Sequence, residues 1–179
     1  MSEISRIVLR LKKAYEKDIG RTPSHEELKK FEEFCEDRNL TDLEAWFCPE
    51  DWFYVDVLKL LNPDDVVFDV GAGDLRFAII ASQMVKKVYA VEINPTILGR
   101  ALTVVGYDLP SNVIPICADA WSLQLPSDVT VITCLMIHRA RSFPREWLSK
   151  RIIYTRREGI FVVENGKLKE VYYDGKIQN

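Results

Sequence analysis

Short apolar runs rich in valine and isoleucine recur from residue 66 onward and alternate with helix-length segments. Residues 74–86 and 95–105 are such segments, and they separate the first three runs. The apolar runs are Val66–Val70, Val88–Glu92, Val113–Cys117, Val129–Leu135 and Gly159–Glu164. Strands that are buried on both faces have this nearly continuous apolar character. The alternation therefore predicts an α/β protein with an open, mainly parallel sheet and helices on both faces.

The C-terminal region predicts a hairpin. The sequence "ENGK", Glu164–Lys167, has the composition of a tight two-residue turn between strands. The turn leads into Leu168–Tyr173, which we expect to be an antiparallel last strand.

The N-terminal third has a different periodicity. Apolar residues at Ile4, Ile7 and Leu11 follow the spacing of one helix face. We predict two regions, a helical cap over residues 1–61 and a ligand-binding α/β domain over residues 62–179.

Composition excludes several classes of protein. The chain has 179 residues, about one domain, and a net charge of −3, so no overall field attracts nucleic acid or anionic lipid. No apolar run is long enough to cross a membrane, and the charged N-terminus does not resemble a signal peptide. The four cysteines form no C-x-x-C pair, which predicts free thiols in a reducing compartment and no metal site. We expect a cytoplasmic protein.

The sequence "VVFDVGAGDLRFAII", residues 66–80, places Gly71 and Gly73 between the first predicted strand and the first helix. Ligands of open parallel sheets bind beyond the carboxyl ends of the strands, where such loops lie. Glycine permits a tight turn and a close approach of ligand to backbone. The loop is therefore the first candidate for a cofactor site.

Three cofactors can be weighed against this loop. A nucleoside triphosphate would require Gly-Lys-Ser or Gly-Lys-Thr, which is absent. A dinucleotide such as NAD would require a glycine at Arg76, and its pyrophosphate would meet the like charge of Asp69. S-adenosylmethionine carries a sulfonium and an ammonium, which favour nearby carboxylates. The charges therefore favour S-adenosylmethionine.

These residues resemble the motifs of class I S-adenosylmethionine-dependent methyltransferases, over roughly residues 62–164. The family's acidic residue and G-x-G-x-G loop are matched at Asp69, Gly71 and Gly73. The resemblance implies that Glu92, 21 residues after Gly71, binds the ribose hydroxyls and that Asp119 contacts the adenine amino group. The implied cofactor-binding residues are Asp69, Gly71, Ala72, Gly73, Glu92, Ile93, Asp119 and Ala120. The implied fold is a Rossmann-like methyltransferase sheet.

A second resemblance lies upstream of the loop. The stretch "FCPEDWFYVDVLKLLNPDDVVFDVGAGDLR" is similar to the lead-in of archaeal protein-lysine methyltransferases, whose loop reads G-D-G-R. The sequence departs from the family at Leu75, which replaces the third loop glycine, and in its short C-terminal region. The side chain of Leu75 either packs in the core or crowds the methionine end of the cofactor, and we expect it to pack in the core.

The methyl acceptor is sought after the fourth predicted strand. His138 lies there and is a candidate proton acceptor near neutral pH. Arg139, Arg141 and Arg145 belong to a basic segment that either faces nucleic acid or forms a solvated surface. The hypothesis from sequence is a methyltransferase that acts on protein lysine, RNA or a small molecule. The alternative is a non-catalytic cofactor-binding or partner-binding protein that retains the fold.

Overall fold

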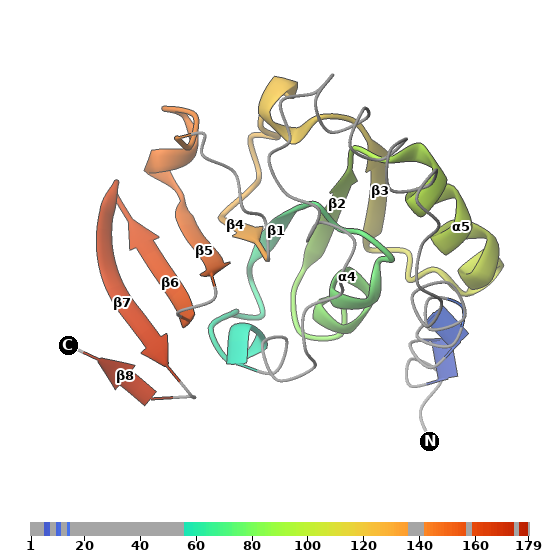
Figure 1. Cartoon of the computed structure of the whole chain (residues 1–179), viewed down its shortest axis with the longest axis horizontal. Coiled ribbons are helices and arrows are strands. Elements are labelled where there is room, and N and C mark those ends of the chain that lie inside the picture. The colour runs from blue at the N-terminus through green and yellow to red at the C-terminus, as the bar shows by residue number, and fades with distance from the viewer. Residues whose placement is uncertain are drawn as a thin grey trace, which may run out of the picture.

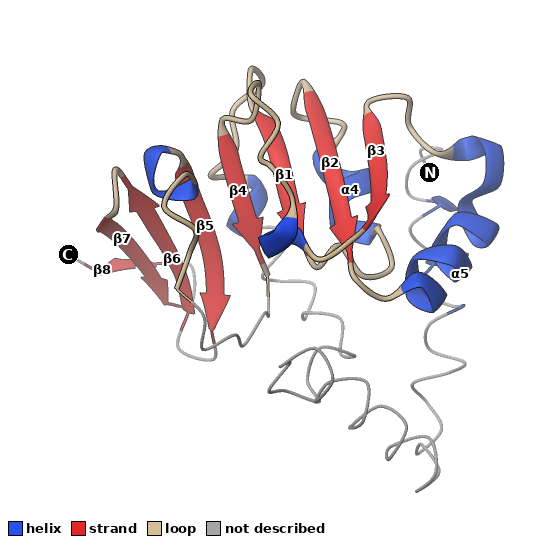
Figure 2. Ribbon diagram, turned by 90° about the horizontal axis from the view of Figure 1, so that it is seen from above, coloured by secondary structure: helices blue, strands red, loops and turns tan. Residues whose placement is uncertain are grey.

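The described residues form one sheet of eight strands in the order β3-β2-β1-β4-β5-β6-β7-β8, shown in Figures 1 and 2. The computed structural model describes residues 6, 7, 10, 11, 14, 56–135, 142–156, 159–173 and 176–178. The strands are β1 (Val66–Val70), β2 (Lys87–Glu92), β3 (Val113–Cys117), β4 (Val131–Cys134), β5 (Arg151–Arg156), β6 (Gly159–Glu164), β7 (Lys167–Tyr173) and β8 (Lys176–Gln178).

Helices of unequal length cover the two faces of this sheet. The α-helices α4 (Arg76–Ala81) and α5 (Pro95–Val105) contribute to the same core cluster and so cover the same face. The single-turn 3₁₀ helices are η2 (Gly106–Asp108), η3 (Ala120–Ser122) and η4 (Trp147–Ser149). On the second face the described helical elements are η3 and η4, which contribute Ala120 and Trp147 to the second core cluster.

The predicted α/β fold with a mainly parallel sheet is confirmed, with a longer antiparallel part than expected. Strands β3, β2, β1, β4 and β5 are parallel, and β5–β6, β6–β7 and β7–β8 pair antiparallel. The sequence did not predict β5 or β8. Arginines begin and end β5, so its apolar run, residues 152–154, is only three residues long and reads as part of a basic segment.

The predicted hairpin is confirmed. Glu164 pairs with Lys167, and the two turn residues, Asn165 and Gly166, have φ values of 50° and 70°. A turn with two left-handed residues matches the twist of the strands it joins, and Asn-Gly is the dipeptide that adopts it most readily.

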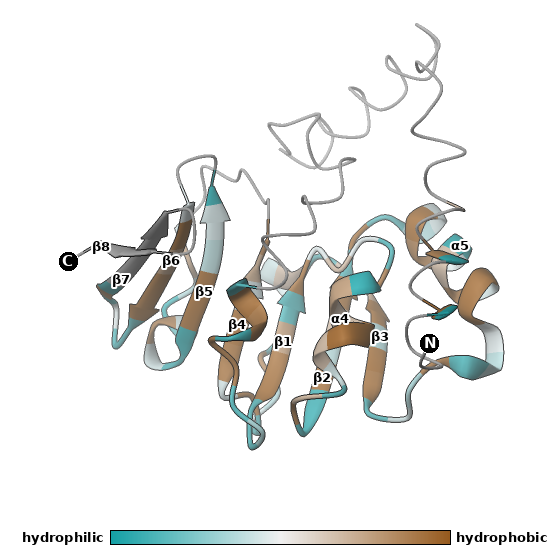
Figure 3. Ribbon diagram, turned by 90° about the horizontal axis from the view of Figure 1, so that it is seen from below, coloured by the Kyte–Doolittle hydropathy of each residue, from teal (hydrophilic) through white to brown (hydrophobic). Residues whose placement is uncertain are grey.

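The two faces of the sheet bury separate hydrophobic clusters, and Figure 3 shows hydrophobic residues along the central strands and on α4. Val67 and Val131 face the cluster under α4, whereas Phe68 faces the cluster around Trp147. This alternation along the strands is why β1 and β4 read as continuous apolar runs.

The predicted helical cap lies mostly outside the described residues. Of its described side chains, Ile7 and Leu11 are buried in the cluster under α4, and Arg10 forms an ion pair of 2.5 Å with Asp108. The described part of the first helix therefore packs beside α5 (Figure 1). The division at residue 61 stays a prediction.

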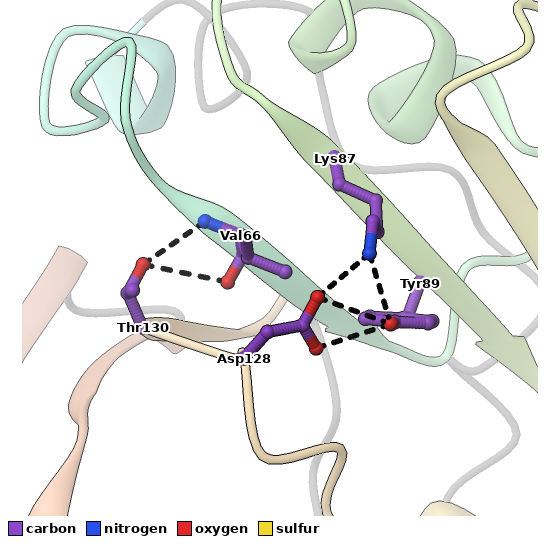
Figure 4. A network of polar contacts seen from close by, with 5 residues as sticks. All are labelled: Val66, Lys87, Tyr89, Asp128 and Thr130. Atoms are coloured by element: carbon purple, nitrogen blue, oxygen red, sulfur yellow. Dashed lines mark hydrogen bonds and ion pairs between the residues drawn. The ribbon is translucent and has the colours of Figure 1, made fainter.

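A polar network fixes the amino ends of three neighbouring strands. Asp65 precedes β1 and accepts hydrogen bonds from the Thr130 hydroxyl (2.9 Å), the Asn62 amide (2.7 Å) and Arg151 (2.5 Å). The amide of Val66 donates to the Thr130 oxygen at 3.0 Å, as Figure 4 shows. One buried carboxylate thus connects β1, β4 and β5.

A second polar cluster beside this network is more exposed. Lys87 donates to Asp128 at 2.6 Å, and the Tyr89 hydroxyl lies 3.1 Å from the same carboxylate (Figure 4). Solvent screening weakens ion pairs of this kind.

We predict that Asp65→Ala lowers the free energy of unfolding by about 2–4 kcal/mol, because three donors lose a charged acceptor near the core. Asp128→Ala is the matched control, since it removes an exposed carboxylate from the same end of the sheet and should cost much less. Urea denaturation of both variants makes the comparison, and equal losses would contradict the role assigned to Asp65.

Candidate functional site

The predicted cofactor residues meet at one edge of the sheet. Strands β1, β2, β3 and β4 are parallel, so their carboxyl ends lie on the same side. The strand order reverses between β1 and β4, which is where open α/β sheets bind ligands. The glycine loop follows β1, Glu92 ends β2, and Asp119 comes two residues after β3.

Every second residue of the glycine loop, from Gly71 to Leu75, has left-handed backbone. Gly71, Gly73 and Leu75 have φ values of 72°, 54° and 67°. The amides of Gly71 and Ala72 both donate to the Val91 carbonyl, at 2.8 and 2.9 Å, so the loop is held against the end of β2. Left-handed backbone is readily adopted only by glycine, which explains both glycines in the sequence.

Leu75 has the backbone of a glycine and the environment of a core residue. Its side chain is fully buried in the cluster under α4, and the residue occupies the N-cap position of that helix without a side-chain hydrogen bond. The expectation that Leu75 packs in the core is confirmed. Its side chain is directed away from solvent, and the cost of its left-handed φ is offset by burial.

We predict that Leu75→Ala costs about 2–5 kcal/mol of stability, because a cavity replaces the side chain. Leu75→Gly should cost about 1 kcal/mol less than Leu75→Ala, because glycine relieves the left-handed strain. Within a helix the order of stability is the opposite, because there a glycine variant is less stable than an alanine variant.

Ile79 provides the matched control, because it is equally buried and lies within α4. There the glycine variant should be less stable than the alanine variant by about 1 kcal/mol. Thermal denaturation of the four variants tests the pair, and a Leu75→Gly protein less stable than Leu75→Ala rejects the interpretation.

Glu92 connects the ends of β2 and the glycine loop. One carboxylate oxygen accepts from the Gly73 amide at 2.9 Å and the other from the Asn94 amide at 2.7 Å. Burial raises the pKa of Glu92, while hydrogen bonds from the amides of Asn94, Gly73 and Ile93 act in the opposite direction. Backbone donors therefore support the charged form of this carboxylate.

Asp69 is a buried carboxylate with much less support. It is 2% exposed, one oxygen accepts from the Thr133 hydroxyl at 2.7 Å, and the other has no hydrogen-bond partner among the described residues. Burial raises the pKa of Asp69 to about 7, the Thr133 hydrogen bond opposes this change, and the charge of Glu92 adds to it. Near neutral pH this side chain is partly protonated.

The raised pKa of Asp69 makes stability depend on pH. The folded protein holds the proton more tightly than the unfolded chain, so the stabilising contribution is complete below about pH 4 and is lost as pH rises through about 7. We predict that the free energy of unfolding of the ligand-free protein falls by about 3 kcal/mol between pH 5 and pH 8 from this group.

Asp69→Asn should remove this dependence, since the amide does not titrate. Asp128→Asn is the control, because the pKa of Asp128 is lowered by its hydrogen bond with Lys87 and it stays ionised over this range. Urea denaturation at both pH values measures the slopes. An unchanged slope in Asp69→Asn disproves the assignment.

The third acidic residue lies on the surface of the same edge. Asp119 is half-buried, and its carboxylate accepts from the Trp121 amide at 3.1 Å, which caps η3. The Ala118 amide donates to the Glu92 carbonyl at 3.1 Å, so the β3 end is held next to the β2 end. Ala120 is buried against the second core cluster, and Ile93 is half-buried.

Sequence reasoning missed two features of the site. Thr133, the donor to Asp69, is a polar residue within an apolar strand, which is the signal that was available. Asp74 and Arg76 form a buried ion pair at the start of α4, with the Arg76 amide donating to the Asp74 carboxylate at 3.1 Å. Arg76 therefore stands at the position where a dinucleotide-binding loop has glycine, and Asp74 compensates its charge.

The residues expected to face an acceptor are mostly outside the described part of the chain. The residues outside the described part are His138, Arg139 and Arg141. Arg145 is described and is exposed. Cys134 is buried at the end of β4, and burial raises the pKa of its thiol, so it is a poor nucleophile.

The described residues contain neither a cluster of metal ligands nor a membrane-spanning helix. Across residues 56–135 and the shorter described ranges, no three His, Cys, Asp or Glu side chains group as metal ligands would. None of the helices described has the length and apolarity required to span a bilayer.

Comparison with known sequences gives a distant relative of this chain. No protein-family model matches the sequence. The uncharacterized protein MJ1452 of Methanocaldococcus jannaschii is 26% identical over 136 residues, which cover 68% of this chain and 52% of that protein. The chain thus spans about half the length of the curated relative that it matches.

Comparison with solved structures bears on the fold. The YcgJ protein of Bacillus subtilis aligns with a TM-score of 0.50 at 20% identity, over 59% of this chain and 50% of that one. An RNA methyltransferase from Salinibacter ruber in complex with S-adenosyl-L-homocysteine aligns with a TM-score of 0.48 at 18% identity, over 60% and 76% of the two chains. The chain has the Rossmann-like fold of the class I S-adenosylmethionine-dependent methyltransferases.

Proposed function

We propose that this protein is an S-adenosylmethionine-dependent methyltransferase. The observation that carries the proposal is the pair of buried carboxylates, Asp69 and Glu92, beside a left-handed glycine loop at the reversal point of the sheet. Two carboxylates so placed favour a cationic ligand over an anionic one, since burial strengthens interactions between charges.

The same pair of carboxylates argues against NAD. Its pyrophosphate would require free loop amides, but the Gly73 amide already donates to Glu92. The pyrophosphate would also be repelled by the charge of Glu92, which backbone amides stabilise. The buried Arg76 is paired with Asp74, so it is not an isolated charge available to an anion.

Each candidate residue has a specific role in this proposal. A carboxylate can accept about four hydrogen bonds, so Glu92 retains capacity for ribose hydroxyls beside its bonds from the amides of Gly73 and Asn94. Asp119 is half-buried, and its role would be to accept a hydrogen bond from the adenine amino group. Gly71 and Gly73 let the ligand lie against the backbone, and Ala72, Ile93 and Ala120 flank these positions.

The cofactor would supply an electrophilic methyl group on a sulfonium. The protein's task is then to orient that group and an acceptor and to exclude water, which is a positioning role. The acceptor would reach the site past the segment after β4, where His138 is the candidate base. Protein lysine, RNA and small molecules remain the acceptor classes, with Arg139, Arg141 and Arg145 as the candidate RNA contacts.

The alternative function is a binding protein without transferase activity. Its basis in the sequence is Leu75, whose side chain would obstruct the cofactor if it pointed into the loop. Because the Leu75 side chain is buried in the core, this basis is weakened. Cofactor binding without methyl transfer to any lysine peptide, RNA or small-molecule acceptor tested would favour the alternative.

We predict that S-adenosylmethionine and S-adenosylhomocysteine bind the full chain and that NAD does not. Glu92→Gln should weaken S-adenosylmethionine binding by about 1–3 kcal/mol, because a ribose hydroxyl loses a charged acceptor. Isothermal titration calorimetry, well below the melting temperature of the variant, measures this change.

Asp128→Asn is the control for this experiment, because it alters a carboxylate at the opposite end of the sheet. Its affinity for the cofactor should equal that of the wild type. Binding of NAD, or the absence of binding by either adenosyl compound, would falsify the proposed function.

A further inference from the structure

The two buried carboxylates of the site differ in their hydrogen-bond donors. Glu92 accepts from the amides of Gly73 and Asn94, one at each oxygen. Asp69 accepts from the Thr133 hydroxyl at one oxygen only, and its second oxygen is buried without a partner among the described residues. When two nearby carboxylates have unequal donors, the less supported one retains a proton more readily.

No charged group among the described residues compensates Asp69. The titratable groups coupled to it are Glu92 on β2 and Cys134 on β4, which are acidic. The loop residues Asp74 and Arg76 pair with each other at the start of α4. A negative charge on Asp69 therefore lies in a buried environment that offers it one hydroxyl.

We propose that, below neutral pH, Asp69 and Glu92 together hold one proton in the ligand-free protein, that Asp69 carries it, and that the cationic cofactor expels it on binding. This inference rests on the proposed function and adds proton-linked binding to it. The O–H bond of the Asp69 carboxyl breaks, its electron pair stays on the carboxylate, and the proton passes to solvent. The charge gained by Asp69 is then balanced by the sulfonium or ammonium of the ligand.

The linkage makes cofactor affinity depend on pH. With a pKa of about 7 for Asp69 in the free protein, the affinity should rise about tenfold from pH 6 to pH 8 and change little above pH 8. The number of protons released should fall from nearly one at pH 6 to about half at pH 7 and to almost none at pH 9.

Isothermal titration calorimetry of the full chain with S-adenosylmethionine tests the linkage. At each pH the titration is done in two buffers that differ in ionisation enthalpy, so that the difference in heat gives the protons released. Asp69→Asn should abolish the release and flatten the pH dependence. Any proton change that remains in this variant belongs to the ligand's own ammonium and is subtracted.

Two further variants keep the proposal testable. Asp119→Asn should bind more weakly with unchanged proton release, because it alters an adenine contact and not the carboxylate pair. Thr133→Val removes the donor to Asp69 and should move the release to higher pH, which provides a test if Asp69→Asn does not fold.

The outcomes distinguish the proton linkage from the proposed function. Proton release in the wild type that is lost in Asp69→Asn supports the linkage. Binding without release, or with equal release in Asp69→Asn, overturns the linkage and leaves the proposed function in place. No binding of either adenosyl compound at any pH overturns both.

Discussion

The parallel pairing of β1 with β2 on one side and β4 on the other is the constraint on which the rest of the structure depends. It places three strand ends together, and because β1 is central, its Asp69 is buried from both sides. The same pairing brings Thr133 opposite Asp69 in register. The glycine loop has to leave this crowded edge within a few residues, which requires its left-handed backbone.

The loop shows how a sequence can depart from a motif while the backbone keeps the motif's geometry. Leu75 has a φ of 67°, similar to those of Gly71 and Gly73. A β-carbon is unfavourable there, but the leucine side chain is fully buried under α4. Local strain and core packing are coupled at this residue, so motif matching alone would misjudge its effect on the site.

The sequence predicted those helices and strands whose ends are marked by nearby residues. The helix Pro95–Val105 and the strand Gly159–Glu164 match the predicted bounds, because proline, glycine and apolar periodicity mark their ends. Strand β5 was missed because Arg151 obscures its start, and the acidic partner of Arg151 is Asp65, 86 residues earlier. The acidic site residues were found as motif positions. That the second oxygen of Asp69 lacks a hydrogen-bond partner among the described residues depends on cross-strand register and could not be read from sequence.

The partners of the other acidic side chains in the described structure show how unusual the surroundings of Asp69 are. Asp65 has three donors, Asp74 has Arg76, and Glu92 has backbone amides. These carboxylates are compensated within the fold, as buried charges must be. Asp69 is not compensated to the same extent, although asparagine would fit the same space with no charge to desolvate. A cationic ligand gives a physical reason for a carboxylate at this position, since it supplies from outside the compensation that the described residues lack.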